Sequence, residues 1–161
     1  MRSWTRQDLK APDYQVAVAT RDHHIDPGDH FAEQPDFLET WPPHCVVGTD
    51  GAELHPRLDR QPIEAVFDKG EHAAAYSGFE GRSEGVSLAD WLRAHGVAAV
   101  DVVGIATDHC VRATALDAVG EGFATRVLLP LTAGVSEATT DAALDQLRAA
   151  GVELEGAVHR G

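Results

Sequence analysis

The sequence predicts an α/β fold, a three-layer α/β/α arrangement built around a mostly parallel sheet. Apolar segments of strand length alternate along the chain with segments of helical periodicity, and this alternation indicates βαβ units. The chain has 161 residues, of which 43% are hydrophobic, enough for one core but not for two large domains. We therefore expect residues 1–161 to form a single domain.

The first half of the chain is expected to hold two strands, a long irregular segment and a helix. Tyr14–Thr20 is an apolar run typical of a buried strand, and Ala65–Phe67 begins a second, short strand. Between them, residues 26–59 are rich in Pro and Gly, and an irregular segment of this length is usually functional. Ser87–His95 repeats its apolar residues at helical spacing, with a serine as N-cap and a glycine after its end.

The second half alternates regularly between strands and helices. Val100–Ala106 is rich in β-branched residues and predicts a strand, as do Ala124–Pro130 and the short Val152–Leu154. His109–Glu121 carries apolar residues on one side and predicts a helix, and Glu137–Ala150 predicts another, with Ser136 as its candidate N-cap.

Acidic residues outnumber basic ones by 26 to 13, which gives a net charge of −13. This balance argues against binding to the phosphate backbone of nucleic acids, which needs a cationic surface, and against an anionic membrane surface. The sequence contains no apolar run long enough to span a membrane, and its first residues do not resemble a secretory signal. Two cysteines form no disulfide framework, so we expect a cytoplasmic protein with reduced thiols.

Three loops that follow strands hold residues capable of chemistry. Ligands bind at the carboxyl ends of the strands in parallel sheets, so we expect the loops after Thr20, Phe67 and Ala106 to converge. The first of these loops leads into a cluster of histidines, and the other two carry Lys69 and Cys110.

Cys110 is expected at the start of a helix. The free N–H groups and partial positive charge at such a position favour a thiolate and can bind a developing oxyanion, so GIATDHC suits a nucleophile. The alternative is a small buried hydrophobic residue, which is how most free cysteines behave. Lys69, at the end of a strand, is either a solvated surface charge or a cation that favours the Cys110 thiolate.

The irregular segment and the strand before it contain four candidate metal ligands. They are Asp22, His24, His30 and His44. A mixed set of imidazoles and a carboxylate suits zinc, iron or manganese, although histidines can also cluster by chance. His23 alternates to the other side of the segment and is not expected to ligate. Cys45, next to His44, either binds the metal or packs as a thiol.

Six stretches are together highly specific for one family by their order and spacing. They are ATRDHHIDPGDHF, WPPHCVVGTDGAELHP, EAVFDKG, AYSGFEG, VDVVGIATDHCVRATALDAV and LTAGVSEATTDAAL. From about Tyr14 to Leu154 the chain resembles the bacterial nicotinamidases, also called pyrazinamidases, of the isochorismatase-like cysteine hydrolases. The resemblance implies an isochorismatase-like fold and hydrolysis of nicotinamide, or of pyrazinamide, at the amide C–N bond. Such a reaction belongs to NAD salvage.

The resemblance also implies a role for each matching residue. It makes Cys110 the catalytic cysteine and Lys69 the catalytic lysine, and it forms the oxyanion hole from the backbone N–H groups of Ala106 and Cys110, with a cis peptide before Ala106. One divalent transition metal ion would be held by the four candidate ligands named above and would meet the pyridine nitrogen. The pocket for the pyridine ring would use Trp41 and Tyr76, with His109 nearby.

One part of the family pattern has no match in this chain. The family's third catalytic residue is an aspartate at the end of a first, central strand, and it transfers the thiol proton to the departing ammonia. None of the candidate aspartates occupies its place; these candidates are Asp13, Asp26, Asp29 and Asp68. We expect that the start was assigned too late and that roughly 25 residues are missing, about a strand, a loop and part of a helix. The alternative is a degraded gene. Without the aspartate, proton transfer would lose about 10²–10⁴-fold.

Three hypotheses for function follow. The first is a nicotinamide amidohydrolase that acts through a Cys110 thioester, as a monomer or a homo-oligomer. The second is a catalytically impaired metal-binding paralogue, which the missing aspartate motivates. The third is a metallohydrolase in which a metal-bound water attacks and Cys110 is incidental.

Overall fold

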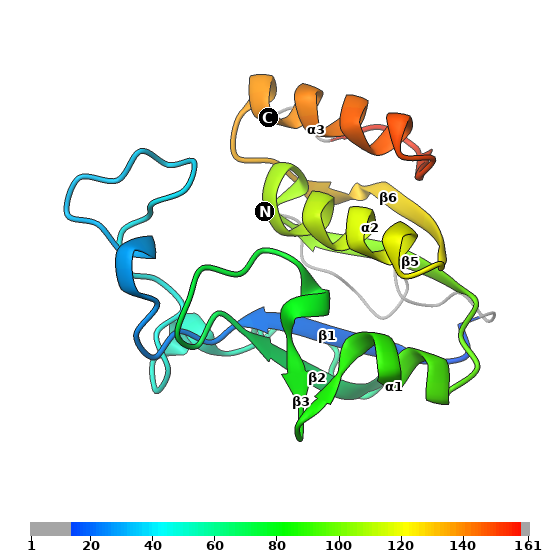
Figure 1. Ribbon diagram of the computed structural model, residues 1–161, viewed down its shortest axis with the longest axis horizontal. Helices are drawn as coiled ribbons and strands as arrows, with labels where there is room; N and C mark the ends of the chain where they lie inside the picture. The colour runs from blue at the N-terminus through cyan, green and yellow to red at the C-terminus, as the bar shows by residue number, and fades with distance from the viewer. Residues whose placement is uncertain (1–13, 159–161) are drawn as a thin grey trace. The chain divides into compact units, whose positions relative to one another are not determined.

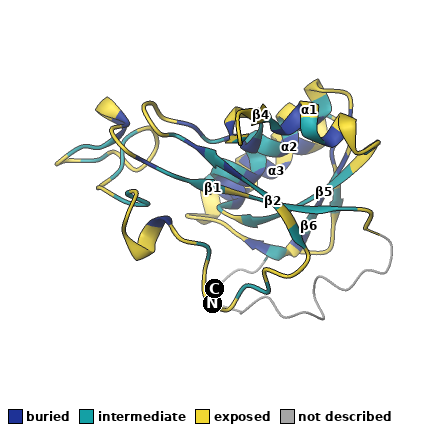
Figure 2. Cartoon of the chain, turned by 90° about the horizontal axis from the view of Figure 1, so that it is seen from below, coloured by how far each residue is buried: buried dark blue, intermediate teal, exposed yellow. Residues whose placement is uncertain are grey.

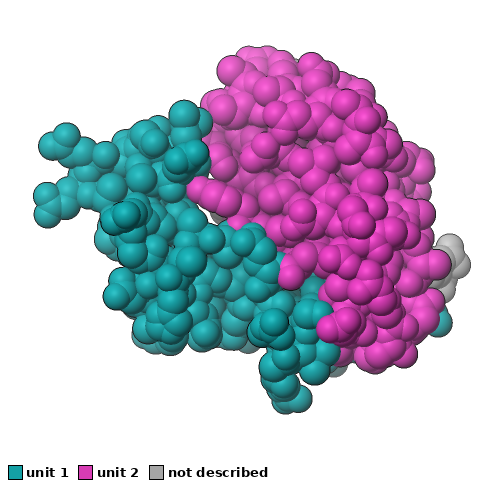
Figure 3. Space-filling model, in the orientation of Figure 1, with its two compact units in different colours: residues 1–75, 80–88 teal, residues 76–79, 89–161 magenta. Residues whose placement is uncertain are grey.

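The computed structural model describes residues 14–158 of the chain, and these residues fall into two compact units (Figures 1 and 3). The first unit runs up to Ala75 and includes Glu80–Leu88, and the second comprises Tyr76–Phe79 and the chain from Ala89 onward. The expectation that all 161 residues form one domain stays a prediction. Among the described residues, no helix is both long enough and apolar enough to cross a bilayer.

The first unit is built on a mixed four-stranded sheet in the order β1-β2-β3-β4. Its strands are β1 (Ala17–Asp22), β2 (Ile63–Lys69), β3 (Arg82–Ser83) and β4 (Val86–Ser87). Strands β1 and β2 are parallel, with Asp22 opposite Lys69, and the remaining pairs are antiparallel. The carboxyl ends of β1 and β2 therefore meet, as expected for the first two of the three loops.

The β3–β4 hairpin was not expected from the sequence. Glu84 and Gly85 at its tip have φ angles of 49° and 83°, which is the left-handed pair that tight two-residue hairpins use. Each strand has only two residues, too few to show an alternating pattern, and Glu-Gly is a weaker turn signal than Asn-Gly or Asp-Gly.

The segment between β1 and β2 is irregular, as predicted. It contains two short 3-10 turns, Gly28–His30 and Asp50–Ala52. Two isolated parallel bridges, His24 with Val46 and Phe31 with Trp41, fold the segment back on itself. These bridges bring residues far apart in the sequence beside the end of β1.

The second unit contains a parallel three-stranded sheet in the order β5-β6-β7. Its strands are β5 (Ala99–Ile105), β6 (Ala124–Ala133) and β7 (Glu153–Glu155), and its helices are α1 (Leu88–Ala94), α2 (Arg112–Gly120) and α3 (Glu137–Ala149). Leu88, the first residue of α1, belongs to the first unit. The Ser136 hydroxyl accepts a hydrogen bond from the Thr139 N–H at 3.2 Å and caps α3, as the sequence predicts.

The core of the second unit lies between its helices and its sheet (buried residues are dark blue in Figure 2). Helix α2 contacts both β6 and α3. The buried side chains of this core are Val111, Ala115, Val127, Leu129, Leu144, Leu147 and Val152.

The α/β class and the mostly parallel strand pairing are confirmed. Every strand and helix expected from the sequence is present, with ends displaced by up to three residues. The largest displacements, of three residues each, are at the start of β1, at the start of α2 and at the end of β6.

Replacing Leu147 by Ala should destabilise the second unit. The Leu147 side chain is fully buried in α3, and its truncation leaves a cavity, so we expect the free energy of unfolding to fall by about 2–5 kcal/mol. Chemical denaturation followed by circular dichroism measures this loss. Leu38→Ala is the matched control, because Leu38 is 58% exposed, and it should change stability by less than about 0.5 kcal/mol. Equal effects of the two substitutions would contradict the assigned core.

Candidate metal centre and nucleophile

Three histidines gather beyond the end of β1. The ligand nitrogens of His24, His30 and His44 lie within 4.8 Å of one another, and their ring centroids are 4.9–5.4 Å apart. His24 and His30 are buried and His44 is half-buried. Three of the four predicted ligands therefore come together around one point.

Backbone carbonyls orient all three imidazoles. The Nδ1 atoms of His24, His30 and His44 lie 2.6, 3.2 and 2.9 Å from the carbonyl oxygens of Gly70, Glu39 and Pro42. With Nδ1 donating to a carbonyl, Nε2 is the nitrogen that can ligate, which is the usual arrangement around a metal ion. His24 Nε2 is buried and has no hydrogen-bond partner, and a metal ion would satisfy it. These residues fit a divalent transition metal.

His30 is suited to ligation by its surroundings. Burial lowers the pKa of His30 below its ordinary value, and the neighbouring His24 and His44 lower it further, while the hydrogen bond to Glu39 acts in the opposite direction. A neutral imidazole is the form that binds metal.

Gly70 makes room for the His24 ring. A Cβ atom at this position would lie 2.7 Å from His24 Cε1 and 2.9 Å from Nδ1, closer than van der Waals contact allows. Its φ of +77° is also a conformation that favours glycine. The glycine after Lys69 therefore has a defined steric role in this site.

Lys69 is buried and paired. Its side chain is 2% exposed, and Nζ donates to a carboxylate oxygen of Asp22 and to the carbonyl of Ala75 at 2.9 Å. A buried ammonium needs such partners, and this pairing excludes the solvated surface charge considered from the sequence. Asp68, the residue before Lys69 in β2, instead binds the Arg21 guanidinium at 2.6 Å.

Asp22 joins a different group of ligand atoms. Its carboxylate, His44 and Cys45 have ligand atoms within 4.8 Å of one another. The four predicted ligands thus divide into two overlapping groups that share His44. His23 points elsewhere, with Nδ1 3.4 Å from the Glu71 carboxylate, in agreement with its exclusion from the ligand set.

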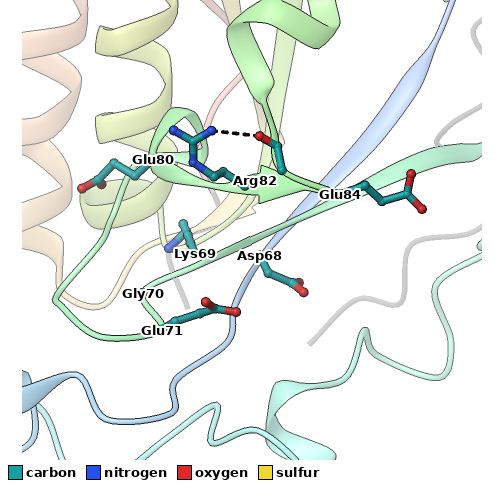
Figure 4. Close-up of a pocket in the computed structure, with 8 residues that line it drawn as sticks. Asp68, Lys69, Gly70, Glu71, Glu80, Arg82 and Glu84 are labelled. Carbon is teal, nitrogen blue, oxygen red and sulfur yellow. Dashed lines mark hydrogen bonds between the residues drawn. The ribbon is translucent and has the colours of Figure 1, made fainter.

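A pocket of about 490 Å³ opens beside β2 and the β3–β4 hairpin (Figure 4). It is lined by Asp68, Lys69, Gly70, Glu71, Glu80, Arg82, Glu84 and Gly85. Arg82 donates to the Gly85 carbonyl at 2.9 Å and so closes the hairpin. Four carboxylates against two cations make this pocket acidic.

In the second unit, Cys110 lies in a single turn of π-helix, Thr107–Val111, that leads into α2. The peptide bond before Ala106 is cis, as the family resemblance implied. The Ala106 carbonyl accepts hydrogen bonds from the N–H groups of His109 and Val111 at 3.1 and 3.0 Å. Cys110 is half-buried, so it is not a fully buried packing residue.

Asp108 anchors this turn, and it was not found from the sequence. Its buried carboxylate accepts hydrogen bonds from the Thr139 hydroxyl and from the N–H groups of Val135 and Ser136, at 3.0 and 3.4 Å. Burial tends to raise the pKa of Asp108, but these hydrogen bonds outweigh it and lower the pKa. The sequence signal available for this anchoring role was an acidic residue two positions before the candidate nucleophile.

The predicted aromatic pocket residues occur in both units. Tyr76 stacks on His109 in the second unit, with ring centroids 5.7 Å apart and an interplanar angle of 29°. In the first unit, Trp41 packs edge-on against Phe37 at 5.9 Å, and its ring centroid is 6.4 Å from that of His44. The approach of the Cys110 loop to Lys69 and the histidines stays a prediction.

Comparisons with known proteins agree on one family. Residues 7–157 match the family model described as the isochorismatase domain. A nicotinamidase/pyrazinamidase of Mycobacterium tuberculosis is 64% identical over 146 residues, which cover 90% of this chain and 78% of that protein.

Two solved structures are similar to the chain. The pyrazinamidase of Pyrococcus horikoshii in complex with zinc has a TM-score of 0.73 and 37% identity, covering 86% of this chain and 74% of its own. The L. infantum protein PnC1 in complex with nicotinate has a TM-score of 0.76 and 40% identity, covering 88% of this chain and 71% of its own.

Gly70→Ala should reduce metal binding. The added methyl group collides with the His24 ring, so we expect less metal bound per chain after incubation with zinc and dialysis, measured by elemental analysis. Gly48→Ala is the matched control, because Gly48 has a similar φ of +83° but no atom within 4 Å of the added methyl group. Equal metal content in the two variants would show that Gly70 has no steric role.

Asp108→Asn should lower stability in a pH-dependent way. The folded pKa of Asp108 is lowered, so its ionised form stabilises the fold fully above the ordinary value of 3.8, and this contribution disappears as the pH falls through the folded value. We expect a loss of about 1–3 kcal/mol at pH 7 that shrinks in acid. Denaturation curves at several pH values measure it, with the exposed Asp117→Asn as control. A loss independent of pH would contradict the role of the charge.

Proposed function

The chain belongs to the isochorismatase family, and on this basis we propose that it hydrolyses nicotinamide to nicotinic acid and ammonia. The observation that carries the proposal is the half-buried Cys110 in the turn that opens α2, in a chain 64% identical to a nicotinamidase/pyrazinamidase. This sequence identity to an enzyme does not favour the catalytically impaired paralogue. Pyrazinamide, the close analogue, is the second substrate that we propose.

The proposed reaction is acyl transfer to Cys110. The thiolate attacks the carboxamide carbon and forms a tetrahedral intermediate, whose oxyanion accepts hydrogen bonds from the backbone N–H groups of Ala106 and Cys110. The C–N bond then breaks, and the departing nitrogen takes up the proton that the Cys110 thiol lost on forming the thiolate. Ammonia departs, and the acyl group stays bound to Cys110 as a thioester. Water attacks the thioester, which releases nicotinic acid and restores the thiol.

Lys69 is the buried cation that we propose for this site. Its ion pair with Asp22 and its hydrogen bond to the Ala75 carbonyl hold Nζ in one position. A positioned ammonium favours the thiolate form of a nearby cysteine and orients a polar substrate. We assign Lys69 this electrostatic role and not that of a surface charge.

The pyridine ring is positioned by aromatic residues and by the metal centre. Tyr76, His109 and Trp41 are the ring-binding residues that we propose, since flat side chains stack well on a heteroaromatic ring. His24, His30 and His44, together with Asp22, would hold a divalent transition metal ion that supplies a ligand site for the ring nitrogen. Correct orientation of substrate and nucleophile can lower the barrier by several kcal/mol.

We also propose the identity of the metal ion, the cellular location and the oligomeric state of the protein. Zinc is the ion named with the Pyrococcus horikoshii structure, and iron and manganese suit the same ligands. Neither cysteine forms a disulfide among the described residues, which is consistent with the cytoplasmic location that we propose. We propose no binding to nucleic acid or membrane, and the sequence is compatible with a monomer or a homo-oligomer.

Cys110→Ala should abolish hydrolysis. Loss of the nucleophile removes the thioester route, so we expect ammonia release from nicotinamide to fall at least about 10³-fold. Ammonia is measured by a coupled assay and nicotinic acid by chromatography, with metal content and thermal unfolding as controls for an intact fold.

The same assay separates the alternatives. Full activity in Cys110→Ala together with no activity in His44→Ala would establish the metallohydrolase instead. A folded, metal-containing wild-type chain that releases no ammonia would establish the impaired paralogue.

A further inference from the structure

Tyr76 belongs to a short segment that joins the second unit although it comes before α1 in the sequence. The segment, Tyr76–Phe79, is part of the second unit, whereas the chain on either side of it is part of the first. Within the second unit the Tyr76 ring stacks on His109, the residue before Cys110. The way this segment is attached to the second unit therefore sets where Tyr76 lies relative to the turn that carries the nucleophile.

A side-chain hydrogen bond attaches the segment to α2. The Gly78 N–H donates to the Thr114 hydroxyl oxygen at 2.8 Å. Thr114 lies on α2, four residues after Cys110, which is about one helical turn. Gly78 is buried, so its N–H needs an acceptor within the protein, and Thr114 supplies it.

Other contacts fold and hold the same segment. Ser77 is buried, and its hydroxyl accepts a hydrogen bond from the Phe79 N–H at 3.2 Å, a local turn typical of serine. The Phe79 ring packs against the ring of Phe123, with centroids 6.0 Å apart. We therefore expect that loss of the Thr114 hydroxyl loosens the segment near Tyr76 and does not unfold it.

We propose that Thr114 is a positioning residue for the pyridine ring of the substrate. Its hydroxyl holds the Gly78 backbone, two residues after Tyr76, and so keeps the Tyr76 ring in place to stack on the substrate. This inference rests on the proposed function, in which Tyr76 binds the ring and Cys110 attacks the amide. Thr114 acts through Tyr76 and takes no part in the chemical step.

The test compares Thr114→Val with Thr114→Ser in the hydrolysis of nicotinamide. Valine has nearly the shape and helix propensity of threonine but lacks the hydroxyl, whereas serine keeps it. A stack on the ring is made in both the ground state and the transition state, so we expect Thr114→Val to raise KM about tenfold and to change kcat by less than about threefold. Thr114→Ser should keep KM within about twofold of the wild-type value.

Thr125→Val is the matched control. It removes another threonine hydroxyl that bonds to the backbone of the second unit, where Thr125 donates to the Phe123 carbonyl at 2.9 Å. Thr125 pairs with Val100 near the start of β5, whereas the Cys110 turn follows the end of that strand. The KM of Thr125→Val should equal that of the wild type.

A second readout separates ring positioning from damage to the turn that carries Cys110. Iodoacetamide alkylates a cysteine thiolate and has no aromatic ring to be positioned. The rate of Cys110 alkylation, followed by peptide mass spectrometry, should therefore change by less than about twofold in Thr114→Val. An alkylation rate that falls as far as kcat/KM would place the effect on the nucleophile and overturn the proposal.

A double-mutant cycle with Tyr76 tests the route of the effect. Tyr76→Leu should raise KM by itself, and adding Thr114→Val should raise it no further, because the segment then carries no aromatic ring to position. Effects that multiply would show that Thr114 acts independently of Tyr76. If Thr114→Val does not fold, Thr114→Ala takes its place in the cycle, since alanine removes the hydroxyl without placing a methyl group against the Gly78 backbone.

The outcomes distinguish this role from the proposed function. A wild-type chain that releases no ammonia from nicotinamide would refute the proposed function and the role of Thr114 with it. An active wild type in which Thr114→Val leaves KM unchanged would refute the role of Thr114 alone.

Discussion

The parallel pairing of β1 with β2 is the constraint on which the metal centre depends. The register sets Asp22 opposite Lys69, and the ladder continues past the strands through the His23 N–H, which donates to the Lys69 carbonyl at 2.9 Å. The next residue, His24, then meets Gly70, whose missing side chain admits the imidazole ring. The acid, the buried cation and the first histidine thus owe their positions to one pair of strands.

The irregular chain after β1 and after β2 supplies carbonyl acceptors that a β-sheet could not. Carbonyl groups inside a β-ladder are used by neighbouring strands, whereas those of irregular chain remain available to other donors. Glu39, Pro42 and Gly70 lie outside the strands, and their carbonyls orient the three imidazoles. Irregular backbone is therefore part of the ligand geometry and not merely a connection between two strands.

Much of the fold and of the site was predictable from the sequence because the signals were local. Apolar periodicity located the strands and helices, and the Ser136 cap marked the start of α3. The β3–β4 hairpin was missed because two-residue strands carry no pattern. The anchoring role of Asp108 was missed because its partners, Val135, Ser136 and Thr139, lie about thirty residues away in the sequence.

The ion pair of Lys69 with Asp22 is a second long-range contact that the sequence did not predict. Sequence spacing predicted that Asp22 and His24 act together as ligands, and this stays a prediction. The spacing did not reveal that the Asp22 carboxylate contacts the ammonium of a residue that is 47 positions away. Long-range contacts of this kind depend on strand register, which a single sequence does not reveal.

The candidate metal ligands and the carbonyls that orient them all lie between Asp22 and Gly70, whereas Cys110 follows Gly70 by 110 − 70 = 40 residues. A ribosome adds about 5–20 residues per second, so this spacing corresponds to about 2–8 s of synthesis. Every group needed to hold the ion therefore exists before the reactive thiol has been made. In the growing chain, the ion's ligands and the nucleophile are separated in time as well as in sequence.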